Sequence, residues 1–236
     1  MTFPHQLFLT SMKHSLYIFP ILLLSLCFLP ACEDNLDEDE DEDDSEFTEN
    51  WKERNAEYFL LCLDSAKTAI AEAQATYGDD WEDHCQWRAY RSWAKAETAP
   101  LTGTDSICVK IVDVGEGTVT PLYTDSIRVN YKGYLIPTES YPEGLVFDHS
   151  GLYESDDYVF NPDFAIPSEF SVSNLVEGYT TAVMYMHVGD RWKIYIPQEL
   201  AYQESSSGYV KPYSTLIFDV QLKGIYRSGV VLPDWE

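Results

Sequence analysis

Residues 170–226 read FSVSNLVEGYTTAVMYMHVGDRWKIYIPQELAYQESSSGYVKPYSTLIFDVQLKGIY, and this stretch decides the fold. Apolar and polar residues alternate over 192–196 and again over 216–222, which is typical of antiparallel strands with one buried face. The apolar residues of 179–186 instead have the spacing of an amphipathic helix, and Gly189 follows them. The stretch therefore predicts one short helix, terminated by Gly189, and then two strands.

The alternation extends upstream of this stretch. Residues 107–111 and 127–135 again place apolar side chains at every second position. Four alternating segments and one short helix predict a single α+β domain that contains an antiparallel sheet.

Residues 47–99 follow a helical period. Apolar residues recur at helical spacing over 51–77, residues 78–80 (Gly-Asp-Asp) interrupt the pattern, and a second helix is expected from Trp81 to about Lys95. Three tryptophans of this second part need cover, and they are Trp81, Trp87 and Trp93. They either pack on the domain that follows or form a helical interface with another molecule.

The first residues are typical of an export leader. A short basic segment precedes the apolar run 16–29, which is too short to span a bilayer comfortably. The ending Leu-Pro-Ala-Cys resembles a bacterial lipobox, so residues 1–31 are expected to be a signal peptide and Cys32 the lipidated first residue of the mature chain. The alternative is an ordinary cysteine behind a standard signal peptide. Met12 is a more natural start than Met1.

An acidic segment follows the leader. Residues 33–46 hold eleven acids and no base, so residues 32–46 are expected to form a solvated linker. Acids behind a lipidated cysteine resemble a surface-export signal of lipoproteins of the Bacteroides group, and the alternative is a plain spacer that faces the periplasm. The net charge is −25, and residues 47–236 still hold 29 acids against 14 bases. Nucleic acid is therefore excluded as a partner, because its binding requires a cationic surface.

Three cysteines remain behind the leader, namely Cys62, Cys85 and Cys108. An exported protein can form disulfides, and Cys62 and Cys85 fall in two helices that are expected to be adjacent. The alternatives are a bridge between these two or three small, buried apolar residues. The histidines behind the leader share no metal-ligand spacing, so no metal is expected; they are His84, His149 and His187.

Five blocks of the sequence resemble the FKBP-type peptidyl-prolyl isomerases. They are VNYKGYL at 129–135, FDHS at 147–150, VEGYTTAVMYMHVG at 176–189, IPQELAY at 196–202 and PYSTLIFDVQL at 212–222. The resemblance implies an FKBP-like fold over residues 104–227, in which a curled antiparallel β-sheet wraps around one short α-helix, with an α-helical segment before it and a tail at 228–236. Some envelope members of the family carry helical N-terminal arms that dimerise, so a homodimer through residues 47–99 is one expectation.

The resemblance also implies an active site. The side chains that match the family's catalytic pocket are Tyr131, Phe147, Asp148, Tyr179, Tyr202 and Phe218. The residues that match its peptide contacts are Leu175, Val176 and Val210, and either Phe164 or Phe170 supplies a further wall. The chain departs from the family at three positions: Tyr179 stands where tryptophan is usual, Gln203 replaces a glycine and Lys211 replaces a proline.

The chemistry of such a site needs neither a nucleophile nor a cofactor. Rotation about an X-Pro bond has a barrier of about 18–20 kcal/mol because it destroys amide resonance. A dry aromatic pocket favours the twisted, less dipolar amide over the planar one. The sequence predicts a lipid-anchored envelope isomerase that acts on proline-containing peptides or unfolded exported proteins. The alternative is a non-catalytic FKBP-like lipoprotein that binds peptides or a surface partner.

Overall fold

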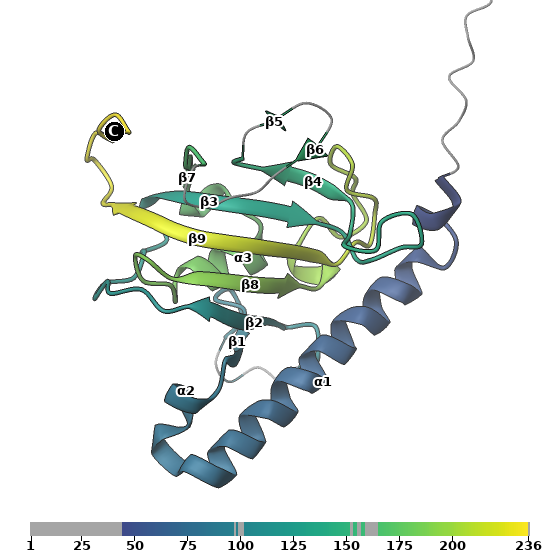
Figure 1. Cartoon of the computed structure of the whole chain (residues 1–236), viewed down its shortest axis with the longest axis horizontal. Coiled ribbons are helices and arrows are strands. Elements are labelled where there is room, and N and C mark those ends of the chain that lie inside the picture. Colours follow the sequence, from purple (N-terminus) through teal and green to yellow (C-terminus); the bar gives the residue numbers. More distant parts are fainter. Residues whose placement is uncertain are drawn as a thin grey trace, which may run out of the picture. The chain divides into compact units, whose positions relative to one another are not determined.

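The computed structural model describes residues 44–96, 98, 102–151, 153–154, 157–158 and 165–235. The predicted signal peptide, Cys32, nearly all of the acidic linker and Phe164 lie outside the described residues. Figure 1 shows one curved sheet with a long helix beside it. The strands are β1 (Trp87–Arg91), β2 (Ser106–Asp113), β3 (Ser126–Tyr134), β4 (Val146–His149), β5 (Tyr153–Glu154), β6 (Asp157–Tyr158), β7 (Ser168–Ser171), β8 (Arg191–Ile196) and β9 (Leu216–Tyr226). The helices are α1 (Trp51–Tyr77), α2 (Trp81–His84) and α3 (Glu177–Val183), with short 3₁₀ turns at Asp44–Phe47, Gly78–Asp80, Val172–Asn174 and Gln198–Leu200.

The main sheet has seven strands, and every pairing in it is antiparallel. Its order is β1-β2-β8-β9-β3-β4, and β7 pairs with β3. The strands predicted from alternation are confirmed as β2, β3, β8 and β9, and they occupy the centre of the sheet. The small pair of β5 and β6 forms a separate two-stranded sheet.

Helix α3 packs on one face of the sheet. Its Gly178 has no room for a side chain, because a Cβ there would lie 2.3 Å from Cγ2 of Ile196 and 3.2 Å from Cγ2 of Ile107. Residues 178–183 of α3 are all buried. This packing explains the alternation of β2 and β8, whose inward-facing residues close the core against the helix.

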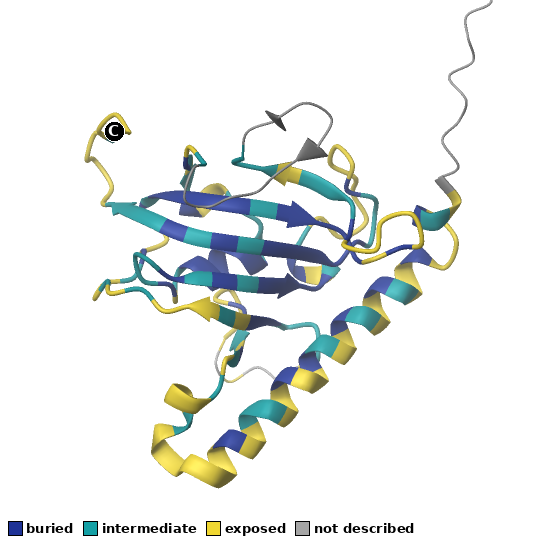
Figure 2. Cartoon of the chain, viewed as in Figure 1, coloured by how far each residue is buried: buried dark blue, intermediate teal, exposed yellow. Residues whose placement is uncertain are grey.

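Helix α1 packs on the other face, over β1, β2 and β8. Neighbouring residues on a strand point to opposite faces, and Tyr195 follows Ile194 and precedes Ile196 on β8. Tyr195 lies beside Tyr58 and Cys62 of α1, whereas Ile196 faces α3. The buried residues of α1 form the stripe that Figure 2 shows along it, and they include Phe59, Leu63, Ala66 and Ala73. No helix among the described residues is both long enough and apolar enough to cross a membrane.

The second predicted helix is wrong beyond its first turn. Helix α2 ends at His84, and Trp87–Arg91 forms β1, which pairs with β2 along its whole length. The spacing of Trp87 and Tyr90 is compatible with a helix, but in β1 these rings lie on opposite faces of the sheet. Trp87 packs on Tyr195, with 5.9 Å between ring centroids, and Tyr90 stacks on Trp192, also at 5.9 Å. Both faces of this edge are covered, so its residues do not alternate.

Each of the three tryptophans in the second part of the N-terminal segment contacts another side chain of the chain, and Trp93 is still 43% exposed. The guanidinium of Arg88 lies 4.7 Å from the ring centroid of Trp81, and the ring centroid of Trp93 lies 4.6 Å from that of Tyr123. Trp87 and Trp93 contact the following domain through Tyr195 and Tyr123. Trp81 contacts Arg88 of its own segment, so an interface with another molecule remains the open alternative. The cysteines at 62, 85 and 108 are all free, so the Cys62–Cys85 bridge is not formed.

The predicted end of the short helix is also corrected. Helix α3 ends at Val183, and Gly189 lies in the turn before β8. Gly189 has φ +99°, and a Cβ added to it would lie only 2.9 Å from Cα of Gly115. The glycine is needed for this turn, where its own N–H donates to the carbonyl of Leu222 over 2.8 Å; it does not cap the helix.

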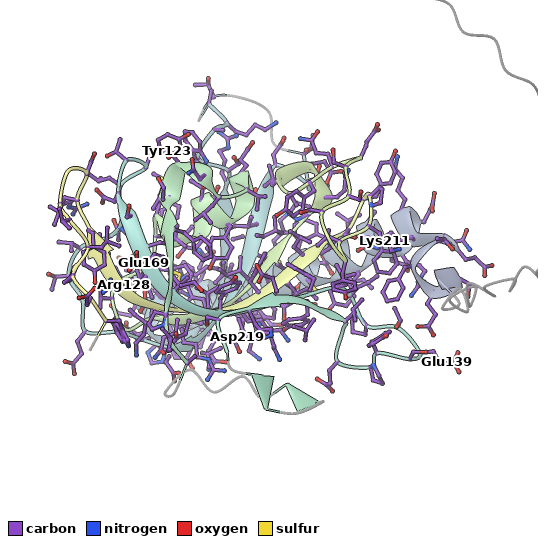
Figure 3. All side chains as sticks on the ribbon, turned by 90° about the horizontal axis from the view of Figure 1, so that it is seen from above. Tyr123, Arg128, Glu139, Glu169, Lys211 and Asp219 are labelled. Atoms are coloured by element: carbon purple, nitrogen blue, oxygen red, sulfur yellow. The ribbon has the colours of Figure 1, made fainter. Side chains whose placement is uncertain are left out.

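The C-terminal tail folds back onto β3. Arg128, although on the face opposite α3, is buried, and Figure 3 shows its side chain beside Glu169. Its guanidinium donates to the Glu169 carboxylate and to the carbonyl of Pro233, and it lies 5.7 Å from the ring centroid of Trp235. These contacts hold the tail against the sheet.

Candidate active site

Aromatic side chains from separate elements meet on the α3 face of the sheet. The ring of Phe218 on β9 lies 4.9 Å from that of Tyr179 on α3, at an interplanar angle of 89°. The ring of Phe147 on β4 lies 5.5 Å from Phe218, at 88°. Edge-to-face contacts of this kind are favourable for aromatic rings, and they place Phe218 at the centre of the cluster.

A second aromatic pair lies beside this cluster. Tyr131 on β3 is buried, and its ring centroid lies 5.5 Å from that of Phe170 on β7. The hydroxyl of Tyr131 is close enough to Tyr179 to influence its ionisation. The sequence offered two candidates for a further wall of the site. Phe170 lies beside Tyr131, and Phe164 lies outside the described residues.

Gly133 provides the space in which these rings meet. It pairs with Asp148 on one side and with Phe218 on the other. A Cβ at Gly133 would lie 2.6 Å from Cζ of Phe147 and 2.7 Å from Cε1 of Phe218. The glycine of VNYKGYL therefore allows the two rings to cross over the strand.

The FDHS block forms the end of β4 and the residue after it, and it is hydrogen-bonded to Tyr131. The N–H of Tyr131 donates to Oγ of Ser150 over 2.9 Å, and the N–H of Ser150 donates to the carbonyl of Tyr131 over 3.0 Å. The N–H of His149 donates to Oδ1 of Asp148 over 2.9 Å. These bonds explain why an aspartate and a serine follow Phe147, because they fix the Asp148 carboxylate next to Tyr131.

The hydroxyls of Tyr131 and Tyr179 remain protonated in the neutral range. Burial raises the pKa of Tyr131 above its usual value, and hydrogen bonding to the Asp148 carboxylate raises this pKa further. Burial also raises the pKa of Tyr179 well above its usual value, with smaller contributions from Tyr131 and Asp148. The Tyr179 hydroxyl is buried and has no hydrogen-bond partner among the described residues. It is thus a donor inside an apolar cluster.

The remaining predicted residues lie on the segments around the cluster. Leu175 and Val176 lead into α3 one turn before Tyr179, and the hydroxyl of Thr180 holds this entry by donating to the carbonyl of Val172 over 2.9 Å. Tyr202 follows the 3₁₀ turn at 198–200, is 38% exposed and is near enough to influence the Tyr131 hydroxyl.

Val210 lies in the loop that follows Tyr202. It is 2% exposed, and a pair of backbone hydrogen bonds of 2.9 and 3.0 Å joins it to Ser207. Its burial is that of a core residue.

The two substitutions in this loop have different structural consequences. Gln203 has φ 56°, in the left-handed region where glycine is usual, which costs on the order of 1 kcal/mol. Lys211 lines a cavity of about 460 Å³ together with Phe47 and Trp51 near the start of α1. It lies among residues of α1, and none of the predicted site residues line that cavity.

A cavity of about 500 Å³ lies elsewhere, between α2 and the ends of β1 and β2. Its lining includes Tyr90, Tyr185 and Trp192 but none of the predicted site residues. Sequence reasoning missed the structural roles of Gly133 and Ser150, although both stand inside the quoted blocks. The spacing of residues along the sequence does not predict which aromatic ring packs against which.

The sequence matches a known family over this region. Residues 117–223 match the family described as FKBP-type peptidyl-prolyl cis-trans isomerase. The "FKBP-type 22 kDa peptidyl-prolyl cis-trans isomerase" of Escherichia coli is 38% identical over 114 residues, which are 48% of this chain and 47% of that protein. The chain thus spans about half the length of this relative.

Two further similarities extend into the N-terminal segment. The "Outer membrane protein MIP" of Legionella longbeachae is 27% identical over 165 residues, which are 69% of this chain and 63% of that protein. The crystal structure of FkpA from Escherichia coli aligns with a TM-score of 0.43 and 24% identity, over 77% of this chain and 74% of the other.

Proposed function

Residues 117–223 belong to the FKBP-type peptidyl-prolyl cis-trans isomerase family, and we propose that the protein isomerises X-Pro bonds of exported proteins. The observation that carries the proposal is the cluster in which Phe147 and Tyr179 each meet Phe218 edge to face. Such a site offers apolar walls to a prolyl ring, and burial raises the pKa of the Tyr131 and Tyr179 hydroxyls that border it.

Catalysis at this site proceeds by non-covalent stabilisation. The planar X-Pro amide is more dipolar than the twisted one, so an apolar enclosure raises the energy of the planar form relative to the transition state. Phe147, Phe218 and Tyr179 supply the enclosure. The Tyr131 hydroxyl is engaged by Asp148, so the polar edge of the site keeps its orientation while the substrate bond rotates.

The roles that we assign follow the family pattern. Walls and polar groups that touch the prolyl residue are Tyr131, Phe147, Asp148, Tyr179, Tyr202 and Phe218. Contacts to the rest of the peptide are Leu175, Val176 and Val210. We assign the isomerase chemistry to residues 104–227, with 47–99 as a helical segment ahead of it and 228–236 as a tail. No cofactor enters the reaction.

A protease-coupled assay with a short prolyl peptide tests the function. The purified full chain should accelerate cis-to-trans conversion, and Val231→Ala should be equally active because this side chain is 89% exposed and outside the site. A wild-type protein without activity that still binds proline-containing peptides would establish the non-catalytic alternative. A protein with neither property would refute both.

We further propose that Cys32 carries a lipid that anchors the protein in the cell envelope, as an outer-membrane lipoprotein on the periplasmic or the outer surface. The acidic residues 33–46 would then be the tether, and the Legionella relative is named an outer membrane protein. Metabolic labelling with a fatty acid should mark the wild type. Cys32→Ala should leave the membrane fraction, and a wild type without label would refute the anchor.

A homodimer through residues 47–99 is a separate hypothesis. Leu60 and Leu61 of α1 are 48% and 61% exposed, which is unusual for adjacent leucines on a helix whose other face is packed. Sedimentation of the wild type should give twice the chain mass, and Leu61→Glu should give a monomer. A monomeric wild type at high concentration would end this hypothesis.

A further inference from the structure

The loop from Gln203 to Tyr213 connects two residues of the proposed site to α1. It begins directly after Tyr202 and contains Val210. The loop is closed at its base, where the N–H of Tyr213 donates to the carbonyl of Gln203 over 2.7 Å. Both base residues have positive φ, 56° at Gln203 and 64° at Tyr213. A conformation of this kind persists only where surrounding contacts hold it.

Those contacts come from the first turns of α1. Nε1 of Trp51 donates to Oγ of Ser214 over 3.1 Å. The N–H of Thr215 donates to Oδ1 of Asn55 over 2.7 Å, and Oγ1 of Thr215 donates to the carbonyl of Asn55 over 3.0 Å. The residues joined by the last two bonds are 160 positions apart. Trp51 and Asn55, one helical turn apart, thus bind Ser214 and Thr215, which directly follow the loop.

Asn55 is a buried polar residue inside a helix, and its hydrogen bonds lead to the segment after the loop. Asparagine is unfavourable within a helix because its amide competes with the backbone, and here it is also completely buried. Its Nδ2 donates to the carbonyl of Trp51 over 2.7 Å, which leaves Oδ1 directed at Thr215. A buried amide with both ends satisfied fixes a unique arrangement of helix and loop.

A fourth contact holds the base of the loop itself. Nζ of Lys52 lies 4.1 Å from the ring centroid of Tyr213, so a cation stacks on the residue with the positive φ. Figure 3 shows Lys211, the loop residue two before Tyr213, beside the first turns of α1. Residues of α1 therefore contact Tyr213, which has the positive φ, and also Ser214, which follows it.

We propose that Trp51 and Asn55 are positioning residues of the isomerase site, and that α1 fixes the loop 203–213 for catalysis. The role of the helix thus goes beyond that of a spacer or an arm. This proposal rests on the proposed function, because the loop matters for catalysis only if Tyr202 and Val210 contact the peptide. When the hydrogen bonds from Trp51 and Asn55 are lost, Tyr202 and Val210 are no longer held in position relative to the aromatic cluster.

Amide hydrogen exchange and prolyl-peptide kinetics of the full chain test the proposal together. In Asn55→Ala and in the milder Trp51→Phe, which keeps one aromatic ring but loses the indole N–H donor and part of the buried ring volume, the amides of 203–213 should exchange at least about tenfold faster. The same variants should lose about tenfold in kcat/KM, within the range expected for misplaced contacts. Leu63→Ala is the matched control, because Leu63 is buried in α1 two turns beyond Asn55, which is about 12 Å further along the helix.

Leu63→Ala should lower Tm as Asn55→Ala does, while its loop exchange and kcat/KM stay at wild-type values. Unchanged loop exchange in folded Asn55→Ala and Trp51→Phe would overturn the proposal, and so would equal loop exchange in Leu63→Ala. Faster exchange without any loss of kcat/KM would overturn the positioning role. If the wild type were inactive, the proposed function would fail, and the exchange data would still decide whether α1 fixes the loop.

Discussion

Gly133→Ala should disable the site while the fold persists. The added Cβ would lie 2.6 Å from Cζ of Phe147 and 2.7 Å from Cε1 of Phe218, whereas ordinary contacts begin at 3.4 Å. The rings must therefore move by about 0.8 Å, which is the difference between 3.4 and 2.6 Å. A displacement of this size in a substrate-positioning group lowers rates by about 100-fold.

The stability cost of this change should be moderate. Inserting a methyl group into a packed site costs about 1–3 kcal/mol, and about 2 kcal/mol would lower Tm by about 4–8 °C in a protein of this size. The measurements are the protease-coupled assay at 10 °C and thermal unfolding by circular dichroism. We expect kcat/KM to fall about 100-fold at a temperature where the variant is fully folded.

Gly224→Ala is the matched control for this experiment. Gly224 is also a strand glycine and pairs with Arg128, but a Cβ there would meet only the end of the Tyr226 side chain, at 3.1 Å or more. It should keep wild-type kcat/KM. A Gly133→Ala protein with wild-type activity and unchanged Tm would refute the view that this glycine makes room for the two rings.

Four further predictions concern single groups. Phe147→Ala should lower kcat/KM about tenfold or more, the equivalent of about 1.4 kcal/mol, whereas Tyr131→Phe should lose less because its ring remains; the coupled assay compares them, and full activity of the first would contradict the wall role. The rate should be flat from about pH 6.5 to 8, because burial lowers the pKa of His149 and raises that of Tyr131, so both stay neutral; a steep pH profile that vanishes in a His149 variant would disprove this. Gln203→Gly should raise the unfolding free energy by about 1 kcal/mol by relieving a positive φ, as denaturant titration can measure, and a drop in stability would be inconsistent with strain there. Asp190→Asn should lower the unfolding free energy by about 1–3 kcal/mol. The buried carboxylate accepts hydrogen bonds from two backbone N–H groups, each at 2.7 Å, and an amide has only one acceptor oxygen. An unchanged Tm would contradict this.

The centre of the sheet could be predicted from the sequence, and its edges could not. Apolar and polar residue types alternate along β2, β3, β8 and β9, although polar residues of β3 such as Arg128 and Asn130 are buried as well. Strand β1 has rings packed on both faces, so Trp87 and Tyr90 imitate a helical spacing. Strands β4 and β7 have four residues each, which is too short for a period to stand out.

The candidate site was predictable only where it repeats a family pattern. The cluster of Phe147, Tyr179 and Phe218 follows from the resemblance, and the structure brings these rings together. The grip of Asn55 on Thr215 joins residues 160 positions apart. Such a contact leaves no local signal, because an asparagine in a helix looks the same whether its amide faces water or a distant loop.

The order of the strands determines when the protein can fold. Strand β9 is the last element of the chain, yet it lies between β8 and β3 in the middle of the sheet. Until its residues have been synthesised, β3 and β8 have no partner on their inner edges, and α1 cannot dock on Ser214 and Thr215. Long-range pairing of this kind is slow and leaves unpaired strands exposed meanwhile. A protein proposed to isomerise the prolyl bonds of other chains therefore remains an incomplete sheet until its own last strand is made. A chain that stops before residue 216 lacks the strand that pairs with both β3 and β8.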